Sequence, residues 1–250
     1  MNDVVFDLDN KFITNRPDLF SVVGNAREIA CIEKKHFKNI DIKTSKPTND
    51  LKVKIESDKV INYSLTEYTL PSLPVSPFLI QTLLRRSNQG SHGLLPDLTN
   101  IVMTELGQPM HVFDADKVKG GITVRMARMG EKMITLDNKE VSLSEEMLVI
   151  ADDEAVLALA GIKGGKKAEV DANTKSIILE CANFDSISVR KTAFKTGIRT
   201  DASKRFENNY PVAWAEHAVL RYVYLLQKEQ PGVVYGALTD VYPHPRPNFT

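Results

Sequence analysis

Three residues of this sequence could carry acid–base or hydrogen-bonding chemistry: His111, Glu180 and Thr200. A neutral imidazole both donates and accepts hydrogen bonds, so His111 could hold a carbonyl or a ribose hydroxyl. Glu180 follows the apolar run 177–179, and a carboxylate turned inwards there needs a partner or becomes protonated. Thr200 could offer a hydroxyl. Each also has a plainer interpretation: a turn histidine, an exposed glutamate at a strand end and a helix-capping threonine.

Small residues accompany these candidates. Residues 161–165 read Gly-Ile-Lys-Gly-Gly, which matches neither a phosphate-binding loop nor a dinucleotide fingerprint. Gly161 and Gly164 would expose backbone N–H groups and allow a ligand to approach closely, although a plain turn explains them as well. Ala202 could form the floor of a pocket that a larger side chain would fill. These patterns indicate at most a ligand pocket.

The periodicity of hydrophobic residues predicts the elements that must position these side chains. Strands are expected at 4–9, 51–56, 61–70, 122–127, 132–136, 147–151, 156–160, 176–181 and at the end of 232–242. Helices are expected after an N-cap at Asp18 to about residue 34, over 76–86, from about 97 to 106, and over 186–196 and 210–227. Gly107 and Pro109 end the helix before His111, which predicts a turn for that histidine. Blocks of strands and helices favour an α+β fold, with mixed or antiparallel sheets and packed helices.

Composition bounds the class of protein. The 250 residues are 42% hydrophobic, and no apolar run approaches the roughly 20 residues that cross a membrane. The N-terminal residues do not resemble a secretion signal. Cys31 and Cys181 have no zinc spacing and form no disulfide framework, so we expect free thiols and a cytoplasmic protein. Because no metal-ligand cluster, nucleophile elbow or ATP motif is found, we expect no metal and no cofactor in this chain.

Charge is distributed unevenly along the chain. The net charge is zero, which argues against binding nucleic acid through bulk electrostatics. Between residues 190 and 205, however, six residues are basic and one is acidic. This segment is either an RNA-binding face or a solvated helix surface. The RNA-binding interpretation would use Arg190, Lys191, Lys195 and Lys204.

Several segments together resemble the β subunit of bacterial phenylalanyl-tRNA synthetase. They are residues 13–30, 97–100, 105–114, 120–125, 149–152, 161–165, 179–182 and 200–207, in the family's order and approximate spacing. The most characteristic is 105–114, which reads Glu-Leu-Gly-Gln-Pro-Met-His-Val-Phe-Asp. The resemblance implies a B1-like portion at 1–38, a B3/B4-type editing domain at 50–232, and an exit strand with a Pro-rich tail at 233–250.

The resemblance also implies an activity and partners. The family is a ligase that charges phenylalanine onto tRNA(Phe), with ATP and Mg bound by the α subunit, and this chain has none of those aminoacylation motifs. An apolar pocket rejects an added hydroxyl by only about 10², so tyrosine is mischarged. The editing domain hydrolyses the resulting Tyr-tRNA(Phe). The implied partners are therefore the α subunit and tRNA(Phe), with no membrane.

Residue by residue, the resemblance assigns roles to the candidates. Glu180 matches the glutamate that reads the tyrosine phenol, helped by the Gly161 backbone N–H. His111 matches a histidine near the aminoacyl ester or terminal ribose, and Thr200 and Ala202 match residues opposite it. Gly164 matches a glycine where bulk would block entry. His111 and Thr200 are therefore the predicted catalytic residues.

Two segments depart from the family pattern. Residues 88–90 read Asn-Gln-Gly where the family has Gly-Ile-Arg, so Gly90 replaces an arginine unless Arg86 or His92 takes its role. Residues 208–209 read Asn-Asn in place of a basic residue followed by glycine, which removes a cation. Two alternatives therefore stay open: a non-catalytic RNA-binding or architectural module, and a free-standing deacylase that acts in trans.

Overall fold

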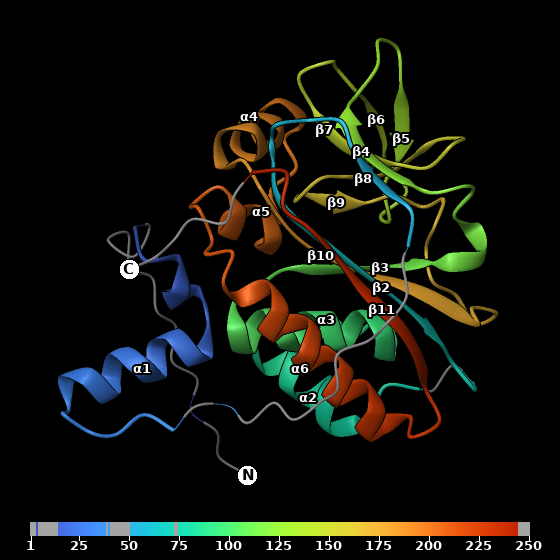
Figure 1. Cartoon of the computed structure of the whole chain (residues 1–250). Helices are drawn as coiled ribbons and strands as arrows, with labels where there is room; N and C mark the ends of the chain where they lie inside the picture. The colour runs from blue at the N-terminus through green and yellow to red at the C-terminus, as the bar shows by residue number, and fades with distance from the viewer. Residues whose placement is uncertain (1–3, 5–14, 39, 41–50, 73–74, 245–250) are drawn as a thin grey trace.

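The computed structural model describes residues 4, 15–38, 40, 51–72 and 75–244 (Figure 1). The helices are η2 (Pro17–Phe20), α1 (Val22–Ile32), α2 (Phe78–Arg86), α3 (Leu94–Leu106), η3 (Ala115–Lys117), α4 (Ser186–Thr196), α5 (Asp201–Phe206) and α6 (Trp214–Glu229). The strands are β1 (Val53–Ile55), β2 (Val60–Thr69), β3 (Met110–Asp114), β4 (Ile122–Met126), β5 (Lys132–Ile134), β6 (Glu140–Ser142), β7 (Leu148–Ala151), β8 (Val156–Leu159), β9 (Lys163–Gly164), β10 (Ser176–Phe184) and β11 (Val234–Val241).

These elements form three layers. The central layer is an antiparallel sheet in the order β11-β2-β10-β3. A five-stranded sheet, β1-β4-β7-β8-β9, lies on one side of it and is mixed, because β1 pairs with β4 in parallel and the other pairs are antiparallel. Helices α2, α3 and α6 lie on the other side, below the central sheet in Figure 1. The predicted α+β class with mixed and antiparallel sheets is confirmed.

Strand β10 separates two hydrophobic cores. Ile178 and Ala182 belong to the core between the sheets, whereas Leu179 and Cys181 belong to the core against the helices. This split follows from the strand itself, since successive side chains point to opposite faces. Glu180 has the parity of Ile178, so its side chain lies between the two sheets. A carboxyl group is therefore built into an otherwise apolar layer.

The helical layer behaves as its apolar periodicity predicts. Leu98 and Val102 of α3 and Tyr222 of α6 are completely buried in the core against the central sheet. Burying each such side chain contributes on the order of 1.5–3 kcal/mol. Helix α3 ends at Gly107, whose φ of 85° is left-handed and whose N–H donates to the Met103 carbonyl at 2.8 Å. The chain then turns directly into β3.

Two expectations about the candidate residues were wrong. His111 does not lie on a turn but in β3, and Glu180 is not near a strand end, because β10 continues to Phe184. The reason is long-range pairing: β10 bonds to β2 on one side and β3 on the other, which keeps both segments extended. Gln108 holds the entry to β3, because its side-chain amide donates to the Pro109 and Ala182 carbonyls at 3.0 Å.

Smaller differences are local. The N-cap of α1 is Ser21 rather than Asp18, since Pro17 opens a 3₁₀ turn first and the Ser21 hydroxyl accepts from the Gly24 N–H at 2.9 Å. Helix α3 begins at Leu94 rather than about residue 97. Strands β3, β6 and β9 were not predicted; each has only two to five residues, too few for a clear pattern.

The η2–α1 segment contacts α5 and α6. Arg205 of α5 donates to the Phe20 carbonyl at 2.7 Å, and the Arg27 guanidinium lies 5.4 Å from the Trp214 ring centroid. The predicted strand 4–9 falls almost entirely outside the described residues, as does most of the Pro-rich tail. The exit strand is β11, at the edge of the central sheet. Among the helices of the described residues, none has the length and apolar character to cross a membrane.

Candidate functional site

A cavity of about 70 Å³ lies between the two sheets and the α5 helix. Five of the six predicted residues that concern substrate or catalysis line it: His111, Gly161, Gly164, Glu180 and Ala202. The remaining lining residues are Pro109, Met110, Ile150, Ala158, Leu159, Ile162, Lys163, Phe184 and Phe206. Most of these are apolar, so the cavity combines an apolar wall with one carboxyl group, one imidazole and the side chain of Lys163.

Glu180 and His111 are direct partners in the pairing of β10 with β3. Opposed residues on neighbouring antiparallel strands project from the same face, with Cβ atoms about 4.5–5.5 Å apart. The His111 ring is held from below by Phe113, the next residue on that face, in an edge contact with ring centroids 4.6 Å apart. The carboxyl and imidazole groups are thus presented together by the backbone.

Glu180 has an unusual environment for a carboxyl group. Its exposed fraction is 6%, and among the described residues it has no hydrogen-bond or ion-pair partner. Burial raises the pKa of Glu180 from 4.5 to about 8. The side chain is therefore mostly a neutral carboxylic acid at pH 7, able both to donate and to accept a hydrogen bond. Such a group is ready to pair with a ligand hydroxyl.

His111 is shifted in the opposite direction. Burial and, to a lesser extent, the charge of Lys163 lower its pKa from 6.5 to about 4. At pH 7 the imidazole is neutral, so it can accept a proton or a hydrogen bond at one nitrogen and donate at the other. The neutral imidazole and the neutral carboxylic acid therefore lie in a cavity that is also lined by one cation, Lys163.

Two glycines keep the cavity open. A Cβ atom on Gly164 would lie 2.7 Å from Nε2 of His111, so any larger residue would displace the imidazole. Gly161 has a φ of 70°, and a Cβ atom there would lie 3.0 Å from the rings of both Phe184 and Phe206. Among the described residues, no hydrogen bond from the Gly161 N–H to the protein is found, which leaves this donor for a ligand.

Thr200 lies beside the cavity but does not line it. Its hydroxyl donates to the Ile162 carbonyl at 2.9 Å and accepts from the Ser203 N–H at 3.1 Å, which completes a capping box for α5. These two bonds hold the start of α5 against the 161–165 segment. Ala202 and Phe206, one helical turn apart, consequently face the cavity.

The other proposed contacts lie elsewhere. His92 borders a different cavity, at the start of α3, and Arg86 is exposed on α2; neither lines the cavity of Glu180. Neither of these two residues therefore takes the place of the family's arginine at this cavity. Residues from β7 and β8, such as Ile150 and Leu159, were missed because only the tertiary fold brings them to the cavity. Phe184 was within reach of prediction, since it continues the alternation of β10.

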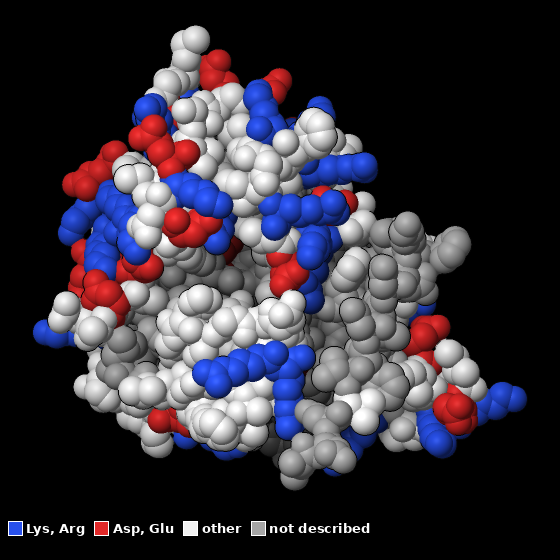
Figure 2. All heavy atoms as spheres, turned by 180° about the vertical axis from the view of Figure 1, so that it is seen from behind, with Lys and Arg blue, Asp and Glu red and all other residues white. Residues whose placement is uncertain are grey.

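The basic candidates are only partly free. Lys195 pairs with Glu146 at 3.2 Å, and Lys204 pairs with Asp201 at 3.2 Å. Seen from behind, basic and acidic side chains are intermingled over the upper part of the molecule, which holds the five-stranded sheet (Figure 2). This mixture fits the zero net charge. In the described part of the chain, no three His, Cys, Asp or Glu side chains gather in a way that could hold a metal ion.

The fold and the cavity can now be compared with known proteins. The model of the B3/4 domain family matches residues 62–230. The chain belongs to the B3/4 domain family. The family name agrees with the resemblance found in the sequence, and the matched residues contain His111, Glu180 and all of the cavity.

Curated proteins are also similar to this chain. The chain is 38% identical over 247 residues to the phenylalanine–tRNA ligase beta subunit of Carboxydothermus hydrogenoformans, covering 97% of this chain and 31% of the relative. It is 40% identical over 228 residues to that of Aquifex aeolicus, covering 91% of this chain and 29% of the relative. The B3/4 chain thus spans about a third of the length of the curated relatives it matches.

A solved structure is also similar, though more distantly. It is an N-terminal fragment of the phenylalanyl-tRNA synthetase beta subunit from Pyrococcus horikoshii, with a TM-score of 0.41 and 20% identity. The match covers 78% of the B3/4 chain and 64% of the fragment.

Proposed function

We propose that this chain is part of a cytoplasmic phenylalanyl-tRNA synthetase β subunit and that its cavity hydrolyses tyrosine from misacylated Tyr-tRNA(Phe). Its partners would be the α subunit and tRNA(Phe), and ATP and Mg would serve only the α subunit. The observation that carries the proposal is the buried, unpartnered carboxyl of Glu180 in a small apolar cavity beside His111. The similarity to phenylalanine–tRNA ligase beta subunits supports it.

The cavity offers a physical basis for selecting tyrosine over phenylalanine. Its volume of about 70 Å³ is roughly half that of the ~150 Å³ cavity that binds benzene, so a tyrosine ring would enter by moving the side chains that line it. Phe184 and Phe206 would flank the ring, and the Glu180 carboxyl would pair with the phenol. Phenylalanine has no phenol group, so the buried carboxyl of Glu180 would have neither water nor a ligand hydroxyl as a hydrogen-bond partner. A site built to bond a hydroxyl rejects the analogue lacking it by about 10⁴–10⁵.

Hydrolysis would rest mainly on orientation. The neutral His111 imidazole can hold the ester carbonyl, the terminal ribose or the attacking water by hydrogen bonds. Correct placement of water and ester converts the attack into an effectively unimolecular step, so a strong general base is not required. Thr200 would contribute as a positioning residue, because its hydroxyl is engaged with Ile162 and Ser203.

The experiment is to measure the hydrolysis of Tyr-tRNA(Phe) and Phe-tRNA(Phe) by this chain at high protein concentration. Glu180→Ala should reduce tyrosine release at least 100-fold, because it removes the group that pairs with the phenol. Glu140→Ala, at an exposed glutamate of β6, is the matched control and should leave the rate unchanged.

A null result would move the measurement into the complete α/β enzyme. Preferential release of tyrosine there, lost in Glu180→Ala, would support the proposal. No hydrolysis in either setting would leave the non-catalytic RNA-binding or architectural module, which the Gly90 departure favours. Equal hydrolysis of both aminoacyl-tRNAs would contradict the role of Glu180.

A further inference from the structure

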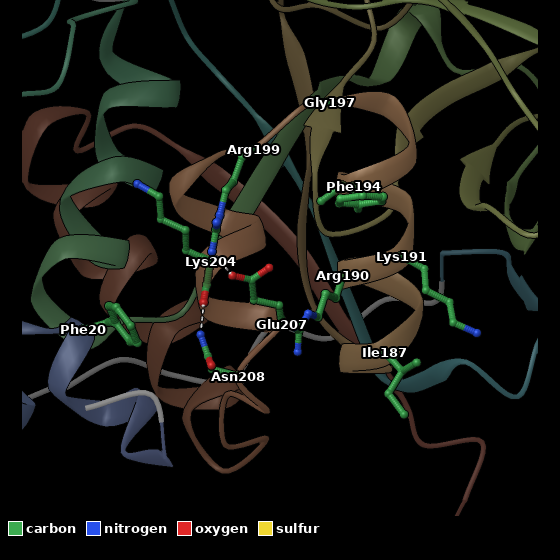
Figure 3. Close-up of a pocket in the computed structure, with 11 residues that line it drawn as sticks. Phe20, Ile187, Arg190, Lys191, Phe194, Gly197, Arg199, Lys204, Glu207 and Asn208 are labelled. Carbon is green, nitrogen blue, oxygen red and sulfur yellow. Dashed lines mark hydrogen bonds and ion pairs between the residues drawn. The ribbon is translucent and has the colours of Figure 1, made fainter. Parts of the chain in front are cut away.

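A groove of about 1030 Å³ lies on the outer side of α4 and α5 (Figure 3). It is separate from the cavity of Glu180. Helix α4 forms one wall, and α5 forms the other together with Phe20 of η2. Figure 3 shows the side chains of Arg190 and Lys191 projecting from α4, with Glu207 across from Arg190. Its size suits an extended ligand, since it is many times the volume of the cavity.

On its groove side, helix α4 has a row of side chains that do not belong to either hydrophobic core. Ile187, Arg190, Lys191 and Phe194 recur at i, i+3, i+4 and i+7, so they share one face of the helix. Phe194 is 92% exposed and Ile187 is 63% exposed. The opposite face of α4 supplies the packing against the sheets. An aromatic ring so exposed, between two cations and a wide groove, indicates a ligand contact.

The charge of the groove is positive. Arg190 and Lys191 have no hydrogen bond or ion pair to any other residue in the described ranges. The groove has one carboxylate, Glu207, and it already pairs with Arg199 at 2.5 Å. Arg190 and Lys191, both about one helical turn before Phe194, are thus left to meet an anionic ligand beside its ring. A polyanion with planar groups matches this arrangement better than an acidic peptide does, because the exposed ring offers a stacking surface.

Helix α5 contributes side chains to both the groove and the cavity, and α4 lies close to the cavity wall. Ala202 and Phe206 of α5 face the cavity, whereas Lys204 and Asn208 line the groove. On α4, Val189 points inwards, where its methyl group lies 3.2 Å from the site of a Cβ on Gly161. The basic groove and the cavity are therefore lined by different residues of the same helix, α5.

We propose that this groove binds single-stranded RNA, with a base stacked on Phe194 and phosphates held by Arg190 and Lys191. The inference rests on the proposed function, since it assigns the partner's single-stranded 3′ end to a surface beside the hydrolytic cavity. Stacking on an aromatic side chain plus a basic track is the usual means of holding single strands without sequence readout. The zero net charge does not oppose it, because two local cations and one ring supply the contacts.

The test is fluorescence anisotropy of this chain with a labelled eight-nucleotide single-stranded RNA ending in CCA, over a salt series. Phe194→Ala should weaken binding roughly 5- to 150-fold with an unchanged salt dependence, because stacking is lost. Arg190→Ala with Lys191→Ala should weaken it and reduce the salt slope by about 1.4, or 0.7 per phosphate contact. The matched controls are Phe78→Ala, at an aromatic residue of α2 that is 79% exposed, and Lys132→Ala with Lys139→Ala.

The outcomes separate this inference from the proposed function. Weaker RNA binding in the groove variants alone supports the groove even if Tyr-tRNA(Phe) is not hydrolysed. Groove variants that bind RNA like the unchanged chain overturn it even if Glu180→Ala abolishes hydrolysis, and Phe194 would then belong to a protein interface. No binding by the unchanged chain at low salt, or equal losses in the controls, would also overturn it.

Discussion

Glu180 and His111 face each other across β10 and β3 as an acid and a base that are both uncharged at neutral pH. In water the carboxyl would lose its proton before the imidazole, and the two would form an ion pair. Burial reverses this order, since it raises the pKa of Glu180 to about 8 and lowers that of His111 to about 4. Both groups can thus form hydrogen bonds with a ligand hydroxyl while they remain uncharged.

This arrangement has a cost that stability measurements can detect. Because the folded pKa of Glu180 is about 8 and the unfolded value is 4.5, its contribution is complete below pH 4.5 and is lost as pH rises through 8. Glu180→Gln, whose side chain cannot ionise, should therefore have a free energy of unfolding similar to that of the unchanged chain at pH 4.5. At pH 8.5 we expect it to be roughly 3–5 kcal/mol more stable than the unchanged chain. Urea denaturation at both pH values measures this.

His111 also makes the free energy of unfolding depend on pH, in the opposite direction to Glu180. Its folded pKa is depressed, so its contribution is present above pH 6.5 and is lost as pH falls through about 4. The two slopes oppose each other between pH 4.5 and 6.5, and only the Glu180 slope continues to pH 8. A stability difference between Glu180→Gln and the unchanged chain that did not grow above pH 6.5 would contradict the buried, unpaired carboxyl.

Gly164 should be indispensable for hydrolysis but not for folding. A methyl group at this position would meet Nε2 of His111, a side chain that can move, rather than a fixed backbone. We expect Gly164→Ala to lower tyrosine release at least tenfold while costing about 1 kcal/mol or less of stability. The control is Gly232→Ala, where the nearest atom is 3.5 Å away. A fully active Gly164→Ala chain would show that the imidazole position is unimportant.

Thr200 distinguishes a positioning role from direct catalysis. Thr200→Val removes the cap of α5 and leaves the Ile162 carbonyl without its donor, so we expect a loss of about 1–2 kcal/mol and slower hydrolysis together. Thr200→Ser keeps the hydroxyl and should restore both. The measurements are urea denaturation and the rate of tyrosine release. A large loss of rate in Thr200→Val with unchanged stability would instead indicate that the hydroxyl takes part in the chemistry.

Local signals in the sequence were enough for part of this site. The end of α3 at Gly107 and the capping role of Thr200 depend on neighbouring residues, and both were predicted from them. The pairing of His111 with Glu180 joins segments about seventy residues apart, which periodicity cannot register. For the same reason, the sequence did not predict that residues of β7 and β8 line the cavity. Their residues read as ordinary buried strands, and only the stacking of two sheets makes them a cavity wall.

Gly161 lines the cavity and lies close to both α4 and α5, the helices that form the walls of the outer groove. Its left-handed φ of 70° strains any residue with a side chain, and a Cβ atom would also press on Phe206 of α5 and Val189 of α4. We therefore expect Gly161→Ala to move both helices, costing roughly 2–3 kcal/mol of stability and lowering tyrosine release and RNA affinity together. Gly130→Ala is the matched control, since its φ is 80° but nothing lies within 4 Å of a Cβ there.

Gly161→Ala and Gly130→Ala both introduce backbone strain, but only Gly161→Ala also disturbs packing. The difference between their losses of stability therefore measures the effect of packing. Gly130→Ala should lose about 1–2 kcal/mol of stability, from conformation alone, and keep both activities. If Gly161→Ala abolished tyrosine release but left the RNA affinity unchanged, α4 and α5 would have kept their places. The groove would then be independent of the cavity, and the two sites would share helices without sharing a position.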